Sequence, residues 1–122
     1  MKLRIQGNSL RIRVTRPDLE QLRREQRLVD VLDLGGGSRF EYTLEIVAGD
    51  DLDASLDAGA LHVRLPSRLA QPWYDDAEVG VRGIKALEGG DELVILIEKD
   101  FECLIPREGE DQSDHFPNPA RA

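Results

Sequence analysis

The residues best suited to chemistry are arginines that alternate with apolar residues near the start of the chain. Arg11 and Arg13 flank Ile12, so they share the strand face opposite the apolar side chains, and Arg4 lies in a similar alternating segment just before them. Guanidinium groups bind carboxylates and phosphates through forked hydrogen bonds. The pattern predicts an anion-binding strand face, and Arg64 in a second alternating segment completes the candidate set.

Two kinds of partner and one purely structural alternative fit these arginines. The partner is an acidic protein or, as a second choice, nucleic acid, for which each neutralised phosphate steepens the salt dependence of binding. Phe40 and Tyr42 alternate toward the inside of their strand, so no platform for stacking bases is evident. Alternatively, the arginines pair across a sheet with outward acidic residues, a common arrangement. Those acidic residues are Glu41, Glu45, Asp51 and Asp53.

The charge of the chain is distributed unevenly. The 122 residues include 16 Lys and Arg against 24 Asp and Glu, a formal net charge of −8. A net negative charge repels nucleic acid and anionic membranes at long range. Yet residues 1–30 hold 8 basic and 4 acidic groups, so a local positive patch is expected there.

Other reactive groups are sparse. The single cysteine, Cys103, excludes an internal disulfide and any multi-cysteine metal site, and only His62 or His115 could serve it as a base. An acidic cluster near the end of the chain could bind a cation, but its spacing matches no recognised metal loop. We therefore predict no cofactor and no metal, and leave catalysis open. That cluster comprises Glu110, Asp111, Asp114 and His115.

The surroundings of the protein can also be predicted. The longest apolar run, 93–97, is far shorter than the roughly 20 residues of a membrane span. The first six residues are charged where a signal peptide would be apolar. These features predict a soluble cytoplasmic protein.

The elements that position the arginines follow from alternation and capping. Two strands separated by Gly7 and Asn8 are expected in 3–14, because the apolar residues change parity at a pair that tolerates a tight turn or bulge. Thr15 and Asp18 resemble a capping box, which predicts a helix as far as about Gln26. Further strands are expected at 28–34 and 40–46, separated by a glycine turn.

The second half shows the same order of elements. Alternation predicts strands at 52–56 and 61–65, then a helix that is short or broken because Pro72 does not fit deep inside a regular one. Trp73 is expected to anchor that helix to the core. A strand beginning near Val79 and a central strand at 93–97, apolar on both faces, complete the series.

A constant offset of 51 residues relates the two halves. It aligns Ile12 with Val63, Arg13 with Arg64 and Leu44 with Ile95 without a gap. We predict a mostly β (α+β) fold in which two ββαββ units, about 1–50 and 52–101, form one compact barrel-like sheet with two short helices. The domain is expected to span 1–106, followed by an acidic tail at 107–122.

Two short segments resemble the AbrB/MazE-type swapped-hairpin transcription factors and antitoxins. These are Gly-Asn-Ser-Leu-Arg-Ile-Arg-Val at 7–14 and Val-Arg-Leu-Pro at 63–66, although Gln6 and Thr15 stand where that family has Trp and Pro. The resemblance implies one barrel built from two swapped units. It also implies DNA contact by Arg4, Arg13 and Arg64.

The whole chain is also similar to an uncharacterised bacterial family. The resemblance rests on the opening 1–14 and on Glu-Lys-Asp-Phe at 98–101, Cys-Leu at 103–104 and Phe-Pro-Asn-Pro at 116–119. It implies no activity. The sequence therefore favours a small non-enzymatic binding or regulatory module that uses its arginine-rich strand face. The alternative is an enzyme or a small-molecule or metal binder whose site the sequence does not locate, and the oligomeric state is left open.

Overall fold

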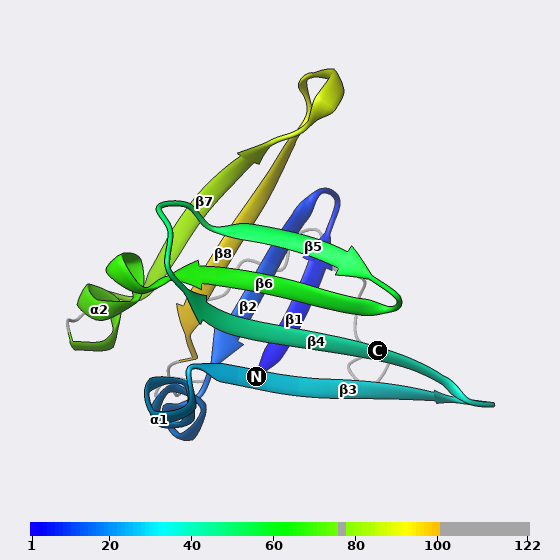
Figure 1. Ribbon diagram of the computed structural model, residues 1–122, viewed down its shortest axis with the longest axis horizontal. Helices are drawn as coiled ribbons and strands as arrows, with labels where there is room; N and C mark the ends of the chain where they lie inside the picture. The colour runs from blue at the N-terminus through cyan, green and yellow to red at the C-terminus, as the bar shows by residue number, and fades with distance from the viewer. Residues whose placement is uncertain (76–77, 101–122) are drawn as a thin grey trace, which may run out of the picture.

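A computed structural model describes residues 1–75 and 78–100, and in these residues strands predominate (Figure 1). The predicted acidic tail, Cys103 and His115 lie outside the described residues. The elements, in chain order, are β1 (Lys2–Gln6), β2 (Ser9–Val14), α1 (Arg16–Glu25), β3 (Arg27–Gly35), β4 (Ser38–Val47), β5 (Asp53–Asp57), β6 (Ala60–Pro66), α2 (Ser67–Asp75), β7 (Gly80–Ala86), the 3-10 turn η1 (Glu88–Gly90) and β8 (Glu92–Lys99).

The strands form two sheets, and each sheet combines one hairpin from either half of the chain. Sheet A has the order β1-β2-β8-β7 and sheet B the order β3-β4-β6-β5. Antiparallel hairpins form the outer pairs, and a parallel pair joins them in the middle of each sheet. The prediction of a mostly β fold with two short helices is confirmed.

The predicted barrel is not confirmed. In the described part of the chain no closed barrel forms, because the strands divide between two four-stranded sheets with edges at β1 and β7 and at β3 and β5. The reason lies in the connections: α1 carries the chain from sheet A to sheet B, and α2 carries it back (Figure 1). These helices separate strands that a barrel would place side by side.

The core lies between the inner faces of the two sheets, with the helices closing one end. Alternation points one side of each strand inward, as Leu10, Ile12 and Val14 show in β2, and these residues are buried. Leu22 of α1 and Trp73 of α2 are fully buried against them. No described helix has the length and apolar character needed to cross a membrane.

Local signals at α1 are confirmed. The Thr15 hydroxyl accepts a hydrogen bond from the backbone N–H of Asp18, and the Asp18 carboxylate accepts one from the N–H of Thr15. The helix ends where Gln26 adopts a left-handed conformation. The predicted parity change at Gly7 and Asn8 is the turn of the β1–β2 hairpin, and Gly7 supplies the positive φ that this turn needs.

Helix α2 is short, as predicted, but it is not broken at Pro72, which lies inside it while the helix continues to Asp75. Proline removes one backbone hydrogen bond, but the residues that follow compensate through burial. Trp73 is 0% exposed, and its indole N–H donates to the carbonyl oxygen of Val79 at 3.3 Å. The prediction that Trp73 anchors this helix is confirmed.

The offset of 51 residues holds for some elements and shifts for others. The β1–β2 and β5–β6 hairpins match in register, since Lys2 lies opposite Arg13 and Asp53 opposite Arg64. In the parallel pairs, Ile12 faces Ile97, but Val63 faces Leu44. The offset predicts that Val63 faces Ile46, so the β4–β6 pair is shifted by two residues relative to the β2–β8 pair. The hairpins concerned have different connections: a glycine turn between β3 and β4, and a longer loop with η1 between β7 and β8.

Candidate functional site: the outer face of sheet A

Three of the four predicted arginines lie together on the outer face of sheet A. Alternation points Arg4 of β1 and Arg11 and Arg13 of β2 away from the core, because Leu10 and Ile12 point into it. The outward residues of β8 and β7 continue this surface. We call it the arginine face: Lys2, Arg4, Gln6, Ser9, Arg11, Arg13, Glu92, Val94, Leu96, Glu98, Gly80, Arg82, Ile84 and Ala86.

Cations face each other directly across the β1–β2 hairpin. Arg4 is the register partner of Arg11, and Lys2 is the partner of Arg13. Like charges in directly opposite positions of an antiparallel pair destabilise a sheet. The hairpin therefore carries two unfavourable cross-strand pairs side by side.

Few carboxylates compensate these cations. Arg11 Nε lies 3.1 Å and Arg13 Nε 3.6 Å from the same atom, Glu98 Oε1. That oxygen is buried and accepts no hydrogen bond from the described residues, so both contacts are ion pairs with poor hydrogen-bond geometry. Lys2 pairs with Asp100 at 2.8 Å.

The remaining two arginines of the face have no acidic partner among the described residues. Arg4 donates only to the neutral amide oxygen of Gln6, at 3.2 Å. Arg82 makes no ion pair or hydrogen bond within the described part of the chain. The face thus sets five cations against the carboxylates of Glu92, Glu98 and Asp100, and of these Glu98 and Asp100 pair with cations of the face.

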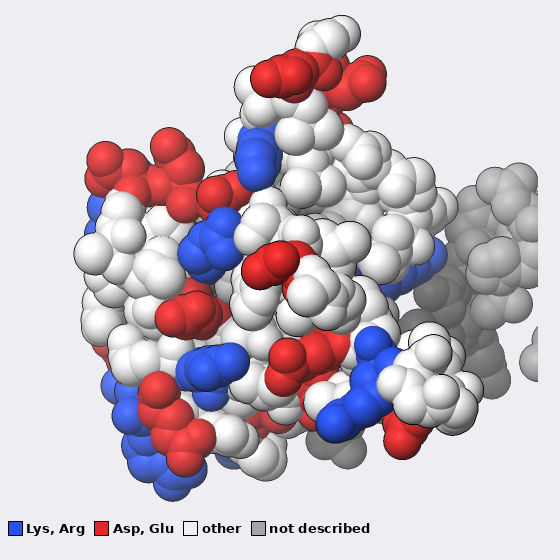
Figure 2. Space-filling view, turned by 45° about the vertical axis from the view of Figure 1, so that its right-hand side comes forward, with Lys and Arg blue, Asp and Glu red and all other residues white. Residues whose placement is uncertain are grey.

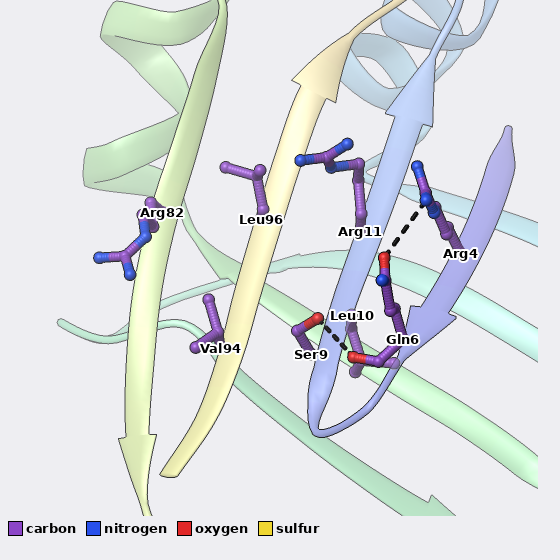
Figure 3. Close-up of a pocket in the computed structure, with 8 residues that line it drawn as sticks. All are labelled: Arg4, Gln6, Ser9, Leu10, Arg11, Arg82, Val94 and Leu96. Carbon is purple, nitrogen blue, oxygen red and sulfur yellow. Dashed lines mark hydrogen bonds between the residues drawn. The ribbon is translucent and has the colours of Figure 1, made fainter. Parts of the chain in front are cut away.

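A shallow hollow of about 220 Å³ lies on this face. Its wall is basic on the β1–β2 side, where Arg4 and Arg11 stand, and apolar on β8, where Val94 and Leu96 point outward (Figure 3). Arg11 extends toward Leu96, whereas Arg82 points away from β8. The hollow can accept an acidic group beside an apolar one.

Arg64 lies on the other sheet and in a different electrostatic setting. Its guanidinium is 3.4 Å from the Asp53 carboxylate and donates to the Ser55 hydroxyl at 3.1 Å. Lys85 binds the same carboxylate at 2.8 Å. The hydrogen bond from Lys85, helped by those from the Ala54 N–H and Arg64, lowers the pKa of Asp53 against the opposing effect of burial.

Arg64 belongs to a row of alternating charge across sheet B. The row runs Arg27, Glu45, Arg64 and Asp53 from β3 to β5 in consecutive register positions. Figure 2 shows the same kind of mixing, with basic and acidic side chains interspersed over the visible surface. The structural alternative, cross-strand pairing with acidic residues, therefore describes Arg64 well and Arg4 poorly.

Comparison with known proteins places the chain in a family. Residues 1–120 match the model of a family of unknown function, DUF7009. The chain belongs to this family. The predicted resemblance to an uncharacterised family is thus confirmed. No curated protein and no solved structure matches the chain, so the resemblance to swapped-hairpin transcription factors stays a prediction.

The other reactive residues do not assemble into a site. His62 lies on β6 between Thr43 and Ser55 on the outer face of sheet B, partly exposed. Cys103 and the cluster 110–115 lie outside the described residues. Within 1–75 and 78–100, no group of three His, Cys, Asp or Glu side chains is arranged to hold a metal ion.

A second hollow of about 590 Å³ lies where α1 begins and β8 ends. Val14, Leu19 and Tyr74 give it an apolar lining, and Arg16 and Glu20 add charge. The Tyr74 hydroxyl is buried and has no hydrogen-bond partner among residues 1–75 and 78–100. Burial raises the pKa of Tyr74, although the nearby Arg23 opposes that effect.

Sequence reasoning missed two cations of the arginine face, Lys2 and Arg82. Both alternate with apolar neighbours, as Arg11 does, so a signal was present. Lys2 joins the face through the β1–β2 hairpin, but Arg82 does so only because β7 joins the sheet of β1 and β2 through β8. That arrangement is a property of the tertiary fold and leaves no mark in the local pattern.

Proposed function

We propose that this chain is a non-enzymatic binding module that holds an acidic protein on its arginine face. The observation that supports the proposal is the pairing of Arg4 with Arg11 and of Lys2 with Arg13. Each opposed pair works against the sheet, by an amount on the order of 0.2–1 kcal/mol for cross-strand pairs. An acidic partner would turn this unfavourable arrangement into binding free energy.

The net charge of −8 does not prevent such binding. At physiological salt the Debye length is about 8 Å, shorter than the width of four strands spaced about 4.8 Å apart. A ligand group on the arginine face is therefore affected mainly by that face. Acidic residues on sheet B and in the loops act chiefly at long range, where salt screens them.

An acidic protein fits the face better than nucleic acid. Val94 and Leu96 lie beside Arg11, and Ile84 beyond them is 50% exposed. Apolar side chains of this kind suit a protein surface. No aromatic side chain is among the outward residues of this face, so stacking of bases has no support.

Fluorescently labelled poly-L-glutamate provides a direct test. We expect binding at 50 mM salt, followed by fluorescence anisotropy, and weaker binding as salt rises. The double variant Arg4→Gln/Arg11→Gln should bind about tenfold more weakly, because charge-assisted contacts contribute about 1.5–3 kcal/mol each before screening. The matched control Arg24→Gln/Arg39→Gln removes the same charge from α1 and sheet B, and should stay within about twofold of the wild type.

Two outcomes would count against the proposal. Absence of polyglutamate binding at 50 mM salt would overturn it. Tighter binding of random duplex DNA than of polyglutamate would replace the acidic protein with nucleic acid as the partner, and the salt slope would then report the number of phosphates contacted.

A small-molecule binder is the second candidate function, favoured by the hollow beside Tyr74. Its volume of about 590 Å³ falls in the range of ligand sites, and the unpartnered hydroxyl could donate to a ligand acceptor. Fragments that raise the melting temperature of the wild type, but not of Tyr74→Phe, would support this candidate. Equal effects on both proteins would reject it.

We also propose that residues 1–50 and 52–101 descend from one duplicated unit. The identical registers of the β1–β2 and β5–β6 hairpins support this proposal. Superposition of the halves in a crystal structure should align strand order and direction.

We further propose that the protein works in the cytoplasm. The single cysteine supports this proposal, because disulfides are rare in that compartment. Localisation of a tagged chain checks the compartment.

A further inference from the structure

We infer that the acidic partner docks as an amphipathic helix lying along β8, with acidic residues on both sides of a narrow apolar stripe. This inference rests on the proposed function and specifies the shape of the partner. It starts from the arrangement of the arginine face in columns, one for each strand.

The apolar part of the β8 column lies between arginines of the two neighbouring strands. Outward from β8 stand Val94 and Leu96, with Arg11 of β2 on one side of Leu96 and Arg82 of β7 on the other. Strands are spaced about 4.8 Å apart, so β2 and β7 lie about 10 Å from each other across β8. A helix with its side chains is about 10–12 Å wide. A helix centred on β8 would therefore place its flanks over Arg11 and Arg82.

The spacing along β8 suits a helix as well. Val94 and Leu96 are two residues apart in the strand, which separates them by about 6.7 Å. Side chains four residues apart on a helix face are about 5–6 Å apart. Two successive turns can thus rest on these residues, and Ile84 opposite Val94 widens the apolar area at one end. On β8 itself the outward residues Glu92 and Glu98 bound the apolar stripe at its two ends.

A helix fits this surface better than an extended segment. A sheet buries an apolar face against a helix or another sheet, whereas an extended peptide adds to a sheet edge through its backbone. Here Arg11, Val94 and Leu96 lie on the face of the two central strands β2 and β8, and Arg82 lies on the same face of the neighbouring edge strand β7. Arg82 points away from β8 in Figure 3, but without a described partner it can turn toward the flank of a helix.

Two labelled peptides of identical composition test the inference. The striped peptide has leucines at i, i+4 and i+7 with glutamates on both flanks, and its isomer has the same residues with the leucines dispersed around the helix. Circular dichroism establishes that both are equally helical. We expect the striped peptide to bind about tenfold more tightly than its isomer in fluorescence anisotropy.

Variants locate the contact. Ile84→Asp should weaken binding of the striped peptide several-fold, and Val29→Asp, which places the same charge at an exposed position of sheet B, should not. Leu96→Ala provides a milder change on the central strand, and it should remove most of the preference for the striped peptide.

The outcomes separate this inference from the proposed function. Equal binding of both peptides would overturn the helical inference and leave an acidic partner without this pattern. Binding of polyglutamate but of neither peptide would do the same. If no acidic chain binds at all, the proposed function fails as well. Tighter binding of random duplex DNA than of the striped peptide would also overturn the inference.

Discussion

The outer faces of the two sheets place arginine in corresponding positions with opposite surroundings. Arg13 of β2 and Arg64 of β6 occupy the same place in matching hairpins. Arg13 has Lys2 opposite it, whereas Arg64 has Asp53. Arg13 shares a single carboxylate oxygen with its neighbour Arg11, whereas Arg64 pairs with the Asp53 carboxylate, which also binds Lys85 through its other oxygen, and donates to a serine hydroxyl.

The difference shows that position in the fold does not determine the role of an arginine. On sheet B the charges alternate across the row from Arg27 to Asp53, and Arg64 has an acidic partner within the protein. On sheet A the cations outnumber the carboxylates, and Arg4 and Arg82 have no acidic partner among the described residues. The same residue type thus serves structure on one face and, in our proposal, recognition on the other.

Charge reversal on each face should separate the two roles. Arg64→Glu places a third acidic group beside Asp53 and Glu45, so we expect a loss of about 1 kcal/mol in the free energy of unfolding, with binding of polyglutamate unchanged. Arg11→Glu should instead weaken that binding by more than about tenfold, or about 1.4 kcal/mol. Its stability should change less, because relief from Arg4 offsets the new contact with Glu98.

Urea denaturation and anisotropy measure the two effects in the same protein samples. The comparison between the faces fails if both variants lose binding equally. It also fails if Arg11→Glu proves the less stable variant of the two.

Removal of the carboxylate on sheet A should improve binding. Glu98→Gln keeps the shape of the side chain but releases Arg11 and Arg13 from their shared partner. We expect affinity for polyglutamate to rise about threefold, less than 1 kcal/mol, with a steeper dependence on salt. Glu45→Gln, the same change between two arginines of sheet B, is the control and should leave binding unchanged. A fall in affinity for Glu98→Gln would show that Glu98 positions the arginines.

Local features of the fold could be predicted from local signals. The capping residues Thr15 and Asp18 determine where α1 begins, and strict alternation identifies β4 and β6. The division into two sheets could not be predicted, because it depends on which hairpins meet across the helices. The two-residue shift in the pairing of Val63 with Leu44 could not be predicted either, since it reflects the different lengths of the β3–β4 and β7–β8 loops.

The candidate site was predictable to the same extent. Arg11 and Arg13 share a face because alternation requires it, and Arg4 joins them through the turn at Gly7. The offset of 51 residues groups Arg64 with them. Arg64 lies elsewhere because the β5–β6 hairpin belongs to sheet B, whereas the β1–β2 hairpin of matching register belongs to sheet A. Arg82 joins the arginine face because β7 belongs to sheet A, which its local pattern does not show.

Acid should weaken sheet B through Asp53. Hydrogen bonds from Lys85, the Ala54 N–H and Arg64 lower the pKa of Asp53 below its ordinary value of 3.8, although burial opposes them. The unfolded chain therefore takes up this proton first, so the stabilisation is complete above that value and is lost as the pH falls through the folded pKa. We expect Asp53→Asn to be about half a kcal/mol less stable than the wild type at pH 7, the range of a solvent-exposed pair, and to equal it in strong acid.

Urea denaturation of both proteins between pH 7 and pH 2 measures this gap. Asp18, whose pKa is also lowered, titrates in both proteins and cancels from the difference. Asp91→Asn serves as a control for the removal of one charge, because the Asp91 side chain makes no hydrogen bond or ion pair in the described residues. A gap that persists unchanged in acid would show that Asp53 acts through shape and hydrogen bonding instead of charge, and the alternating row of sheet B would then not differ electrostatically from the arginine face.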